Sequence, residues 1–335
     1  MALKIGVIGV GMIGQDHIRR LTRVLAGSDV VAVSDSDAAR ARDVAAGLAG
    51  ARAFATGEEL IAAPEVEAVM VCSWGPSHEQ YVTAAIGAGK FVFCEKPLAT
   101  TEQACLNIIA AEVAHGRRLV QVGFMRRYDA GYLAMKKAVA AGEIGAPLIL
   151  HSGHRNASVP SHYTADMAIV DTAVHDIDVA RWLFEDEVAE TLVVAPKKSS
   201  RGGALQDPLI MLLRMAGGAV VDIEVTVNIA YGYDIRGEVI GETGTVELAE
   251  SAPVLVKRNG TVSGRVPEDW RERFLRAYDV EIQDWVDNCR RGTVGGPSSW
   301  DGYAATVVTD AGLAAAKSRT WAKVSLRDKP ALYDA

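Results

Sequence analysis

Residues 3–14 read LKIGVIGVGMIG, an apolar run that leads into three glycines with the spacing G-x-G-x-x-G. In a strand-turn-helix unit the first glycine allows a tight turn, the second lets the backbone approach a pyrophosphate, and the third lets the helix pack on the strand. The N–H groups at the start of such a helix bind phosphate. A plain strand-to-helix turn is the alternative. The motif predicts cofactor contacts at Gly9, Gly11, Met12, Ile13 and Gly14.

A carboxylate follows the motif at the distance that dinucleotide binding requires. The apolar run 30–33 leads to Asp35, about 20 residues after the glycines, where a carboxylate accepts hydrogen bonds from the adenosine ribose. Its charge would repel the 2'-phosphate of NADP, no arginine follows at once, and Asp37 adds a second negative charge. NAD is therefore the predicted cofactor. The alternative role of Asp35 is to cap a helix, which Ser36 or Asp37 could equally do.

Short apolar runs typical of strands alternate with helical segments up to about residue 124. One of the helices is predicted to begin at a capping box of Thr100 and Gln103 and to end at Gly116. Strand and helix alternation predicts a doubly wound parallel sheet with helices on both faces, and hence a Rossmann domain over residues 1–124. The strand candidates are residues 3–10, 30–33, 68–72, 91–94 and 119–122.

From about residue 125 the hydrophobic pattern changes to a period of two. Residues 209–215 form a strand run, two glycines can turn the chain, and apolar and polar residues then alternate over 221–227. A second hairpin is predicted around residues 241–244. This half predicts an α+β domain over residues 125–335, built on a mostly antiparallel, open-faced sheet. Within it, Tyr278, Ile282, Trp285, Val286 and Cys289 share one helical face that is predicted to pack as core.

Composition excludes several classes of function. The chain of 335 residues has a net charge of −7, which argues against a surface that binds nucleic acid. No apolar stretch approaches the roughly 20 residues of a membrane span, and the N-terminus shows no signal peptide. The four cysteines form no C-x-x-C pair, so reduced thiols in a soluble, cytoplasmic protein are expected.

The motif Cys94-Glu-Lys-Pro97 ends the strand run 91–94. Ligands of open α/β sheets bind beyond the carboxyl ends of the strands, so Lys96 is predicted to project towards the nicotinamide crevice. There an ammonium could hold the substrate hydroxyl and stabilise a developing alkoxide. A solvated surface lysine is the alternative.

The stretch Asp171-Thr-Ala-Val-His175-Asp-Ile-Asp178 carries the second catalytic signal. On a helix, residues 171, 175 and 178 lie on one face, and carboxylates beside an imidazole orient it and favour its charged form. A base of this kind suits alcohol oxidation, which releases a proton. A capped helix with a buried histidine is one alternative. A metal site with His151, His154 or His162 is another, although no zinc spacing is present and no metal is predicted.

Several of these stretches resemble the glucose-fructose oxidoreductase, inositol dehydrogenase and rhizopine catabolism family. The resemblance runs nearly the whole length of the chain and implies an NAD-dependent dehydrogenase that oxidises a secondary hydroxyl of a cyclic polyol, foremost myo-inositol to the 2-keto inosose. It also implies a homo-oligomer, a tetramer or a dimer, formed through the open sheet. The stretches that carry it are residues 9–14, 73–78, 93–101, 120–129, 154–156, 171–175, 231–235 and 278–283.

The resemblance also implies roles for individual residues. Lys96, Asp171 and His175 would form a catalytic triad in which His175 is the base, Asp171 orients it and Lys96 positions the reacting oxygen. Ser73, Trp74, Gly75, His78, Glu95 and Lys96 would line the cofactor with Asp35 and the glycine loop. Arg126, His154, Asn156, Asp178 and Tyr233 would join the triad as substrate ligands, and such side chains can pair the many hydroxyls of a polyol.

Two other functions stay open. A dehydrogenase for another inositol isomer or for an aldose such as glucose would use the same triad and differ only in its substrate ligands. A sugar or dinucleotide sensor could keep the fold without turnover. The presence of Lys96, Asp171 and His175 argues against the sensor, because a binding protein needs no base.

Overall fold

The structure is a computed structural model that describes residues 1–249 and 254–334. Two compact units divide the chain. The first comprises Met1–Phe124, Tyr278–Thr306 and the chain from Arg327 onward, and the second comprises Met125–Ala277 and Val307–Leu326. The sequence-based division assigned everything after residue 124 to the second domain. The structure differs, because two C-terminal segments belong to the first unit.

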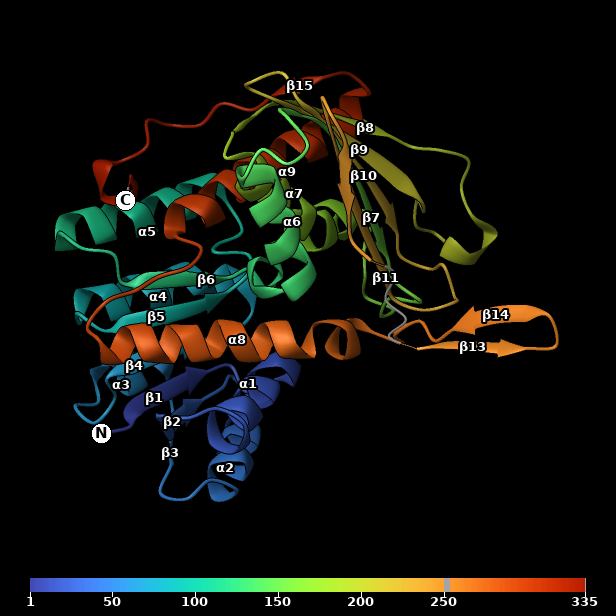
Figure 1. The fold of residues 1–335 in the computed structure, drawn as a ribbon. Helices are drawn as coiled ribbons and strands as arrows, with labels where there is room; N and C mark the ends of the chain where they lie inside the picture. The colour runs from blue at the N-terminus through green and yellow to red at the C-terminus, as the bar shows by residue number, and fades with distance from the viewer. Residues whose placement is uncertain (250–253, 335) are drawn as a thin grey trace. The chain divides into compact units, whose positions relative to one another are not determined.

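The first unit contains the predicted parallel sheet. Its six strands have the order β3-β2-β1-β4-β5-β6, all parallel, with helices on both faces (Figure 1). The sequence missed β3, which has only three residues and no periodic pattern. The strands are β1 (Leu3–Ile8), β2 (Ser28–Ser34), β3 (Arg52–Phe54), β4 (Ala68–Val71), β5 (Phe91–Glu95) and β6 (Val120–Gly123). The helices are α1 (Met12–Arg23), α2 (Ala38–Ala46), α3 (Gly57–Ala62), α4 (His78–Gly87) and α5 (Glu102–His115), with short 3-10 turns at Gly75–Ser77 and Ala331–Tyr333.

Helix α5 begins one residue later than its predicted cap. The Thr101 hydroxyl, and not that of Thr100, accepts a hydrogen bond from the Ala104 N–H group. The capping box of Thr100 and Gln103 is therefore wrong by one residue. Gly116 ends the helix as predicted, in a left-handed conformation with φ of 84°.

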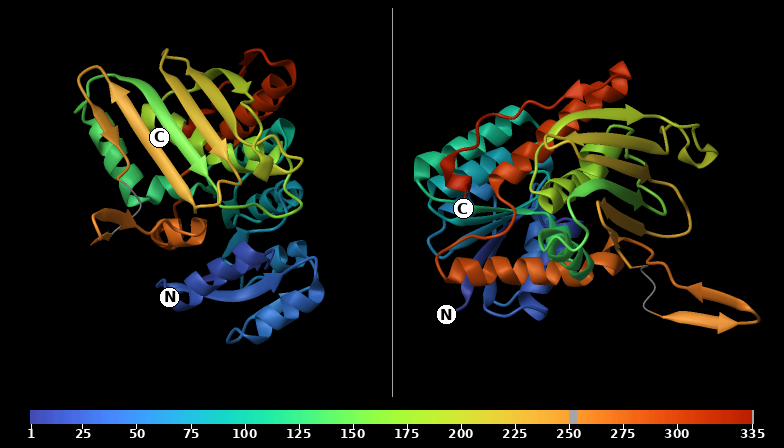
Figure 2. Two further views of the ribbon diagram at one scale, coloured as in Figure 1. Left: turned by 90° about the vertical axis from the view of Figure 1, so that its right-hand side faces the viewer. Right: turned by 45° about the horizontal axis from the view of Figure 1, so that its top comes forward.

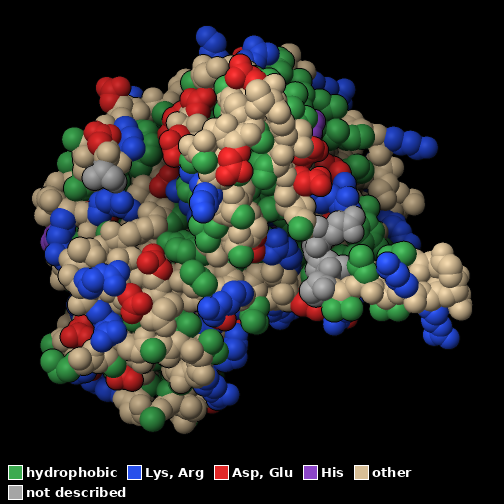
Figure 3. All heavy atoms as spheres, in the orientation of Figure 1, with side chains coloured by type: hydrophobic (Ala, Val, Ile, Leu, Met, Phe, Trp, Pro, Cys, Tyr) green, Lys and Arg blue, Asp and Glu red, His purple; other side chains and the backbone are tan. Residues whose placement is uncertain are grey.

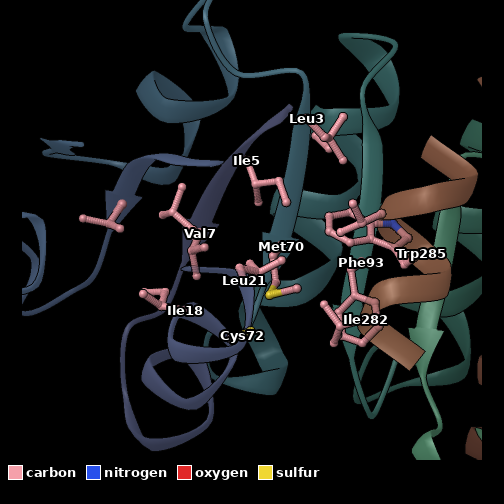
Figure 4. Close-up of a cluster of buried hydrophobic side chains, with 14 of the residues drawn as sticks. Leu3, Ile5, Val7, Ile18, Leu21, Met70, Cys72, Phe93, Ile282 and Trp285 are labelled. Atoms are coloured by element: carbon pink, nitrogen blue, oxygen red, sulfur yellow. The ribbon is translucent and has the colours of Figure 1, made fainter. Parts of the chain in front are cut away.

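The core of the first unit includes a helix from the far end of the sequence. Helix α8 (Trp270–Arg290) supplies Ile282 and Trp285, which pack against Phe93 of β5 and against the strands around β1 (Figure 4). Both side chains are completely buried. The apolar helical face predicted over residues 278–289 is thus confirmed as core.

The second unit contains a seven-stranded mixed sheet in the order β12-β11-β7-β10-β9-β8-β15 (Figure 2). All its neighbours are antiparallel except β7 and β10, which are parallel. Both predicted hairpins are confirmed. The strands are β7 (Pro147–Arg155), β8 (Val188–Val194), β9 (Leu209–Met215), β10 (Val220–Thr226), β11 (Asp234–Gly241), β12 (Thr245–Glu247) and β15 (Ala322–Lys323). The helices are α6 (Ala130–Ala140), α7 (Val174–Phe184) and, from Val307 on, α9 (Ser299–Ser318), with 3-10 turns at Met125–Tyr128 and Ser200–Gly202 and a π-helical turn at Ala168–Ala173.

The period-two pattern places one face of this sheet in the core. Val221, Ile223 and Val225 of β10 are buried, whereas Asp222 and Glu224 between them point to the opposite face. A separate hairpin, β13 (Leu255–Arg258) and β14 (Thr261–Gly264), lies between β12 and α8 in the sequence. No helix among the described residues has the length and apolar character needed to cross a membrane.

Candidate active site

The glycine loop after β1 has the geometry of a phosphate cradle. Gly9 has a φ of 86°, and a Cβ atom there would lie 2.5 Å from the Ser73 backbone nitrogen. A Cβ on Gly14 would lie 2.0 Å from the Gly9 oxygen, whereas Gly11 has open space. Helix α1 then begins at Met12 with no side-chain cap and no acidic residue in its first turn. The loop therefore fits a pyrophosphate at the helix N-terminus.

Asp35 lies directly after β2 and is held by backbone N–H groups. Its carboxylate accepts hydrogen bonds from Val10 (2.7 Å) and Asp37 (2.8 Å) and from the Arg40 guanidinium (2.7 Å). Burial raises the pKa of Asp35, but these hydrogen bonds outweigh it and hold the pKa below its ordinary value. Asp37 caps helix α2, so Asp35 is not the N-cap.

Arg40 is a residue that the sequence missed. The charge of Asp35 was predicted to be unopposed because no arginine follows at once, yet one turn of α2 brings Arg40 to it. The Arg40 side chain is 41% exposed. The Arg40 guanidinium therefore lies beside Asp35, the carboxylate that would accept hydrogen bonds from the ribose.

The loop after β4 carries Ser73, Trp74 and Gly75, next to the glycine loop at the point where the strand order reverses. Trp74 is 80% exposed. His78 is buried, and its ring nitrogens lie 2.9 Å from the Ser73 oxygen and 2.8 Å from the Pro97 oxygen. Burial lowers the pKa of His78, although the carbonyls oppose this. His78 thus ties the β4 loop to the segment after Lys96.

The side chain of Glu95 is directed towards helix α1. Its Oε1 lies 2.6 Å from Nε2 of His17, and both groups are buried. Lys96 follows β5 directly, and its N–H group donates to Glu95 Oε2 at 3.3 Å. The contact with His17, 78 residues away in the chain, gave no signal in the sequence.

Within the second unit, Arg126 and His154 belong to one buried polar network. Arg126 donates to Asp176 (2.6 Å), Ser152 donates to the same carboxylate (2.6 Å), and Nδ1 of His154 lies 2.9 Å from it. Asp176 has no exposed surface. Burial raises its pKa, but Arg126 and His154 together hold the pKa well below its ordinary value. The sequence missed Asp176 as the centre of this network.

His175 and Tyr233 lie against the same network. The His154 ring is 6.3 Å from the His175 ring and 5.8 Å from the Tyr233 ring, measured between centroids. The Tyr233 hydroxyl is 3.4 Å from Nε2 of His154. Burial raises the pKa of Tyr233 to about 12, so the phenol stays protonated near neutral pH. The structure therefore brings four predicted residues, Arg126, His154, His175 and Tyr233, together.

Asp178 has a different environment. Its carboxylate forms a bidentate pair with Arg127, at 3.0 and 2.5 Å. Asp178 has no exposed surface, and the Arg127 side chain is 14% exposed. The sequence placed Asp178 among the substrate ligands without its arginine partner.

Asp171 and Asn156 complete the predicted set in this unit. Asp171 lies in the π-helical turn that precedes α7, whereas His175 lies in α7, which begins at Val174. The two residues are therefore not joined by a continuous α-helix. Turns of the π type are frequent at functional sites. Asn156 follows β7, and its Oδ1 is buried without a hydrogen-bond partner among the described residues. No cluster of three or more metal-binding side chains occurs in the described part of the chain.

Comparison with known proteins identifies relatives over the whole chain. Residues 3–124 match a family model described as an oxidoreductase family with an NAD-binding Rossmann fold, and residues 136–324 match the C-terminal alpha/beta domain of that family. Inositol 2-dehydrogenase 3 of Saccharopolyspora erythraea is 54% identical over 99% of this chain and 98% of its own length. Inositol 2-dehydrogenase of Pseudomonas savastanoi pv. phaseolicola is 53% identical over the full length of both chains.

A solved structure is similar over the same extent. The crystal structure of myo-inositol dehydrogenase from Lactobacillus casei, in complex with NAD(H) and myo-inositol, superposes with a TM-score of 0.97. It is 37% identical in sequence, and the match covers 100% of each chain.

Proposed function

Because this chain belongs to the GFO/IDH/MocA family of oxidoreductases, we propose that it is an NAD-dependent inositol 2-dehydrogenase that oxidises myo-inositol at one secondary hydroxyl. The observation that carries the proposal is the full-length similarity to inositol 2-dehydrogenases, at 53–54% identity. The fold supports it, because a doubly wound sheet with a glycine loop and a second unit with a buried polar network suit a dinucleotide and a polyol.

NAD is the cofactor. The glycine loop and the N-terminus of α1 would hold its pyrophosphate, and Asp35 would accept hydrogen bonds from its adenosine ribose. The nicotinamide, when bound, supplies the hydride acceptor. Side chains of this protein would remove the proton, stabilise the reacting oxygen and bind the remaining hydroxyls.

We assign the acid-base chemistry to three side chains. Oxidation of a carbinol releases a proton, so a base must take it from the hydroxyl; His175 has that role, and Asp171 orients its imidazole. Lys96 donates to the reacting oxygen and stabilises the negative charge that develops on it. Arg126, His154, Asn156, Asp178 and Tyr233 pair the remaining hydroxyls. This set of donors and acceptors discriminates against analogues that lack one hydroxyl.

The test is a polyol panel. Purified protein is mixed with NAD and, separately, with myo-inositol, scyllo-inositol, other inositol isomers and glucose, and NADH absorbance is followed. The highest kcat/KM is expected for myo-inositol. A higher value for another isomer or for glucose would assign a different substrate to the same triad. Tight NAD binding with no turnover of any polyol would instead support a sensor.

We also propose that the protein forms a homo-oligomer, a dimer or a tetramer. The outer face of the second-unit sheet carries apolar side chains, because Leu192 pairs with Leu212 and Val194 with Ile210 opposite the buried face. Val194 is 41% exposed. Light scattering at micromolar concentration measures the mass, and a mass equal to one chain would refute the oligomer.

A further inference from the structure

Three buried ionisable side chains of the first unit, His17, Arg20 and Glu95, have no step in the mechanism proposed above. His17 and Arg20 have no exposed surface, and Glu95 is 7% exposed. Figure 3 shows Lys, Arg, Asp and Glu side chains on the surface that faces the viewer, which is where charged groups usually lie. Because taking such groups out of water is costly unless they are paired, this cluster calls for an explanation.

His17 connects two elements that carry predicted site residues. It lies in α1, whose N-terminus would hold the pyrophosphate, and its Nε2 is 2.6 Å from Oε1 of Glu95, the last residue of β5. Oε2 of Glu95 accepts a hydrogen bond from the N–H group of Lys96 at 3.3 Å. The carboxylate therefore joins α1 to the backbone of the lysine that is proposed to act on the reacting oxygen.

The arginine next to the imidazole determines which ring nitrogen carries the proton. Nη1 of Arg20 lies 3.5 Å from Nδ1 of His17, and a guanidinium donates hydrogen bonds but cannot accept them. Nδ1 therefore accepts, and the proton of the imidazole lies on Nε2. From there it is donated to Glu95, in a hydrogen bond that the charge of the carboxylate strengthens.

Arg20 is itself held in place by two carboxylates. It pairs with Asp16, one turn earlier in α1, and with Asp279 of α8 at 3.1 Å. The His17 ring also packs edge-on against the ring of Phe93, with 5.8 Å between the ring centroids. These contacts hold the imidazole in the orientation in which Nε2 faces Glu95.

Strand β6 closes the other side of the Glu95 carboxylate. A Cβ atom on Gly123 would lie 3.2 Å from Oε2 of Glu95, so the absence of a side chain there makes room for this oxygen. His17 thus holds one carboxylate oxygen, while Gly123 and the Lys96 N–H group confine the other.

We propose that His17 is a positioning residue for the reaction: its imidazole fixes the Glu95 carboxylate, which in turn fixes the backbone of Lys96. This inference rests on the role proposed for Lys96. His17 acts through Glu95. Because Lys96 stabilises a charge that develops in the transition state, a misplaced Lys96 lowers kcat more than it changes KM.

Two substitutions of His17 separate the hydrogen bond from the volume of the ring. His17→Gln keeps an N–H donor for Glu95, whereas His17→Leu fills the space without a donor. His17→Leu is expected to lower kcat for myo-inositol by about tenfold to a hundredfold with little change in KM, and His17→Gln to keep most of kcat. Wild-type kcat in His17→Leu, or an equal loss in both variants, would overturn the proposal.

Leu21→Ala is the matched control for lost stability, because Leu21 is buried in the same helix and belongs to the apolar cluster of Figure 4. Urea unfolding measures the stability of each variant, and Leu21→Ala should lose stability while kcat stays unchanged. Single-turnover formation of NADH in a stopped-flow instrument measures the chemical step directly. That step should be slowed in His17→Leu and not in Leu21→Ala; equal rates in the two variants would contradict the role of His17.

Crystal structures of the two His17 variants test the geometry without relying on turnover. In His17→Leu the Glu95 carboxylate should leave its wild-type position and Lys96 should lose its hydrogen bond, whereas His17→Gln should keep both. Glu95 and Lys96 that stay in place in His17→Leu would overturn this inference alone. A wild type that oxidises no polyol would overturn the proposed function, and with it the part of His17 in the reaction.

Discussion

Replacing Asp176 with asparagine should weaken both the second unit and its binding of substrate. The carboxylate is fully buried and accepts hydrogen bonds from Arg126 and Ser152, each at 2.6 Å, and contacts His154 at 2.9 Å. Removing one partner of a buried ion pair leaves the other charge uncompensated, at a cost of about 3–5 kcal/mol. The asparagine side chain would keep the volume and one acceptor oxygen, so the lower end of that range is expected.

Urea unfolding followed by circular dichroism measures this loss. Glu185→Gln is the matched control: it lies at the end of the same helix, and its pair with Lys136 involves a glutamate side chain that is 76% exposed. Such exposed pairs contribute about 1 kcal/mol or less. If Asp176→Asn is no less stable than the control, the network does not support this unit.

The pH dependence gives the prediction a second readout. The pKa of Asp176 is lower in the folded protein than the ordinary value of about 3.9 in an unfolded chain. Its contribution is therefore complete above about pH 4 and is lost as the pH falls towards the folded pKa. Wild-type stability should decline below pH 4 more steeply than that of Asp176→Asn.

The same variant should also change the kinetics. It should raise KM for myo-inositol more than it lowers kcat, because Asp176 orients two proposed substrate ligands, Arg126 and His154. Parallel acid profiles, or a change confined to kcat, would refute this role.

Three further outcomes are expected. Lys96→Met or His175→Ala should lower kcat by about 10²–10⁴-fold with NAD affinity unchanged; NAD titration and NADH absorbance measure the two effects, and normal turnover would remove that residue from the mechanism. Asp35→Ala should weaken NAD binding by about tenfold to a hundredfold and improve the use of NADP, because Arg40 is released to bind a 2'-phosphate. If the ratio of kcat/KM for the two cofactors does not change, another group binds the ribose. Trp285→Ala should cost about 3–5 kcal/mol by leaving a cavity against the first sheet, and an unchanged urea midpoint would contradict that packing.

Local patterns were sufficient to predict the two kinds of sheet. The glycine loop at 9–14 and the alternating strand at 221–227 each encode their conformation in neighbouring residues, and both were predicted with nearly correct bounds. Strand β3 was missed because three residues are too few for a period. The cap at Thr101 was placed one residue early because Thr100 offers the same hydroxyl.

The polar partners within the site could not be predicted in the same way. Arg126 and Asp176 are 50 residues apart, and nothing near either one indicates the other. Arg40 pairs with Asp35 only because α2 turns it back towards β2. The apolar face of α8 was predicted from the sequence. An amphipathic pattern shows that a helix face is buried, but it does not identify the sheet or helix that covers that face.

The position of Trp285 in the first unit has a consequence for synthesis. Ribosomes deliver the chain from its N-terminus, and domains commonly fold as they emerge. Here the core of the first unit cannot be completed until α8 has been synthesised, and its residues emerge after nearly the entire second unit. A fragment that stops at residue 124 would expose to water the apolar side chains that Ile282 and Trp285 cover. A cofactor-binding fragment that is to be expressed therefore has to include this distant helix.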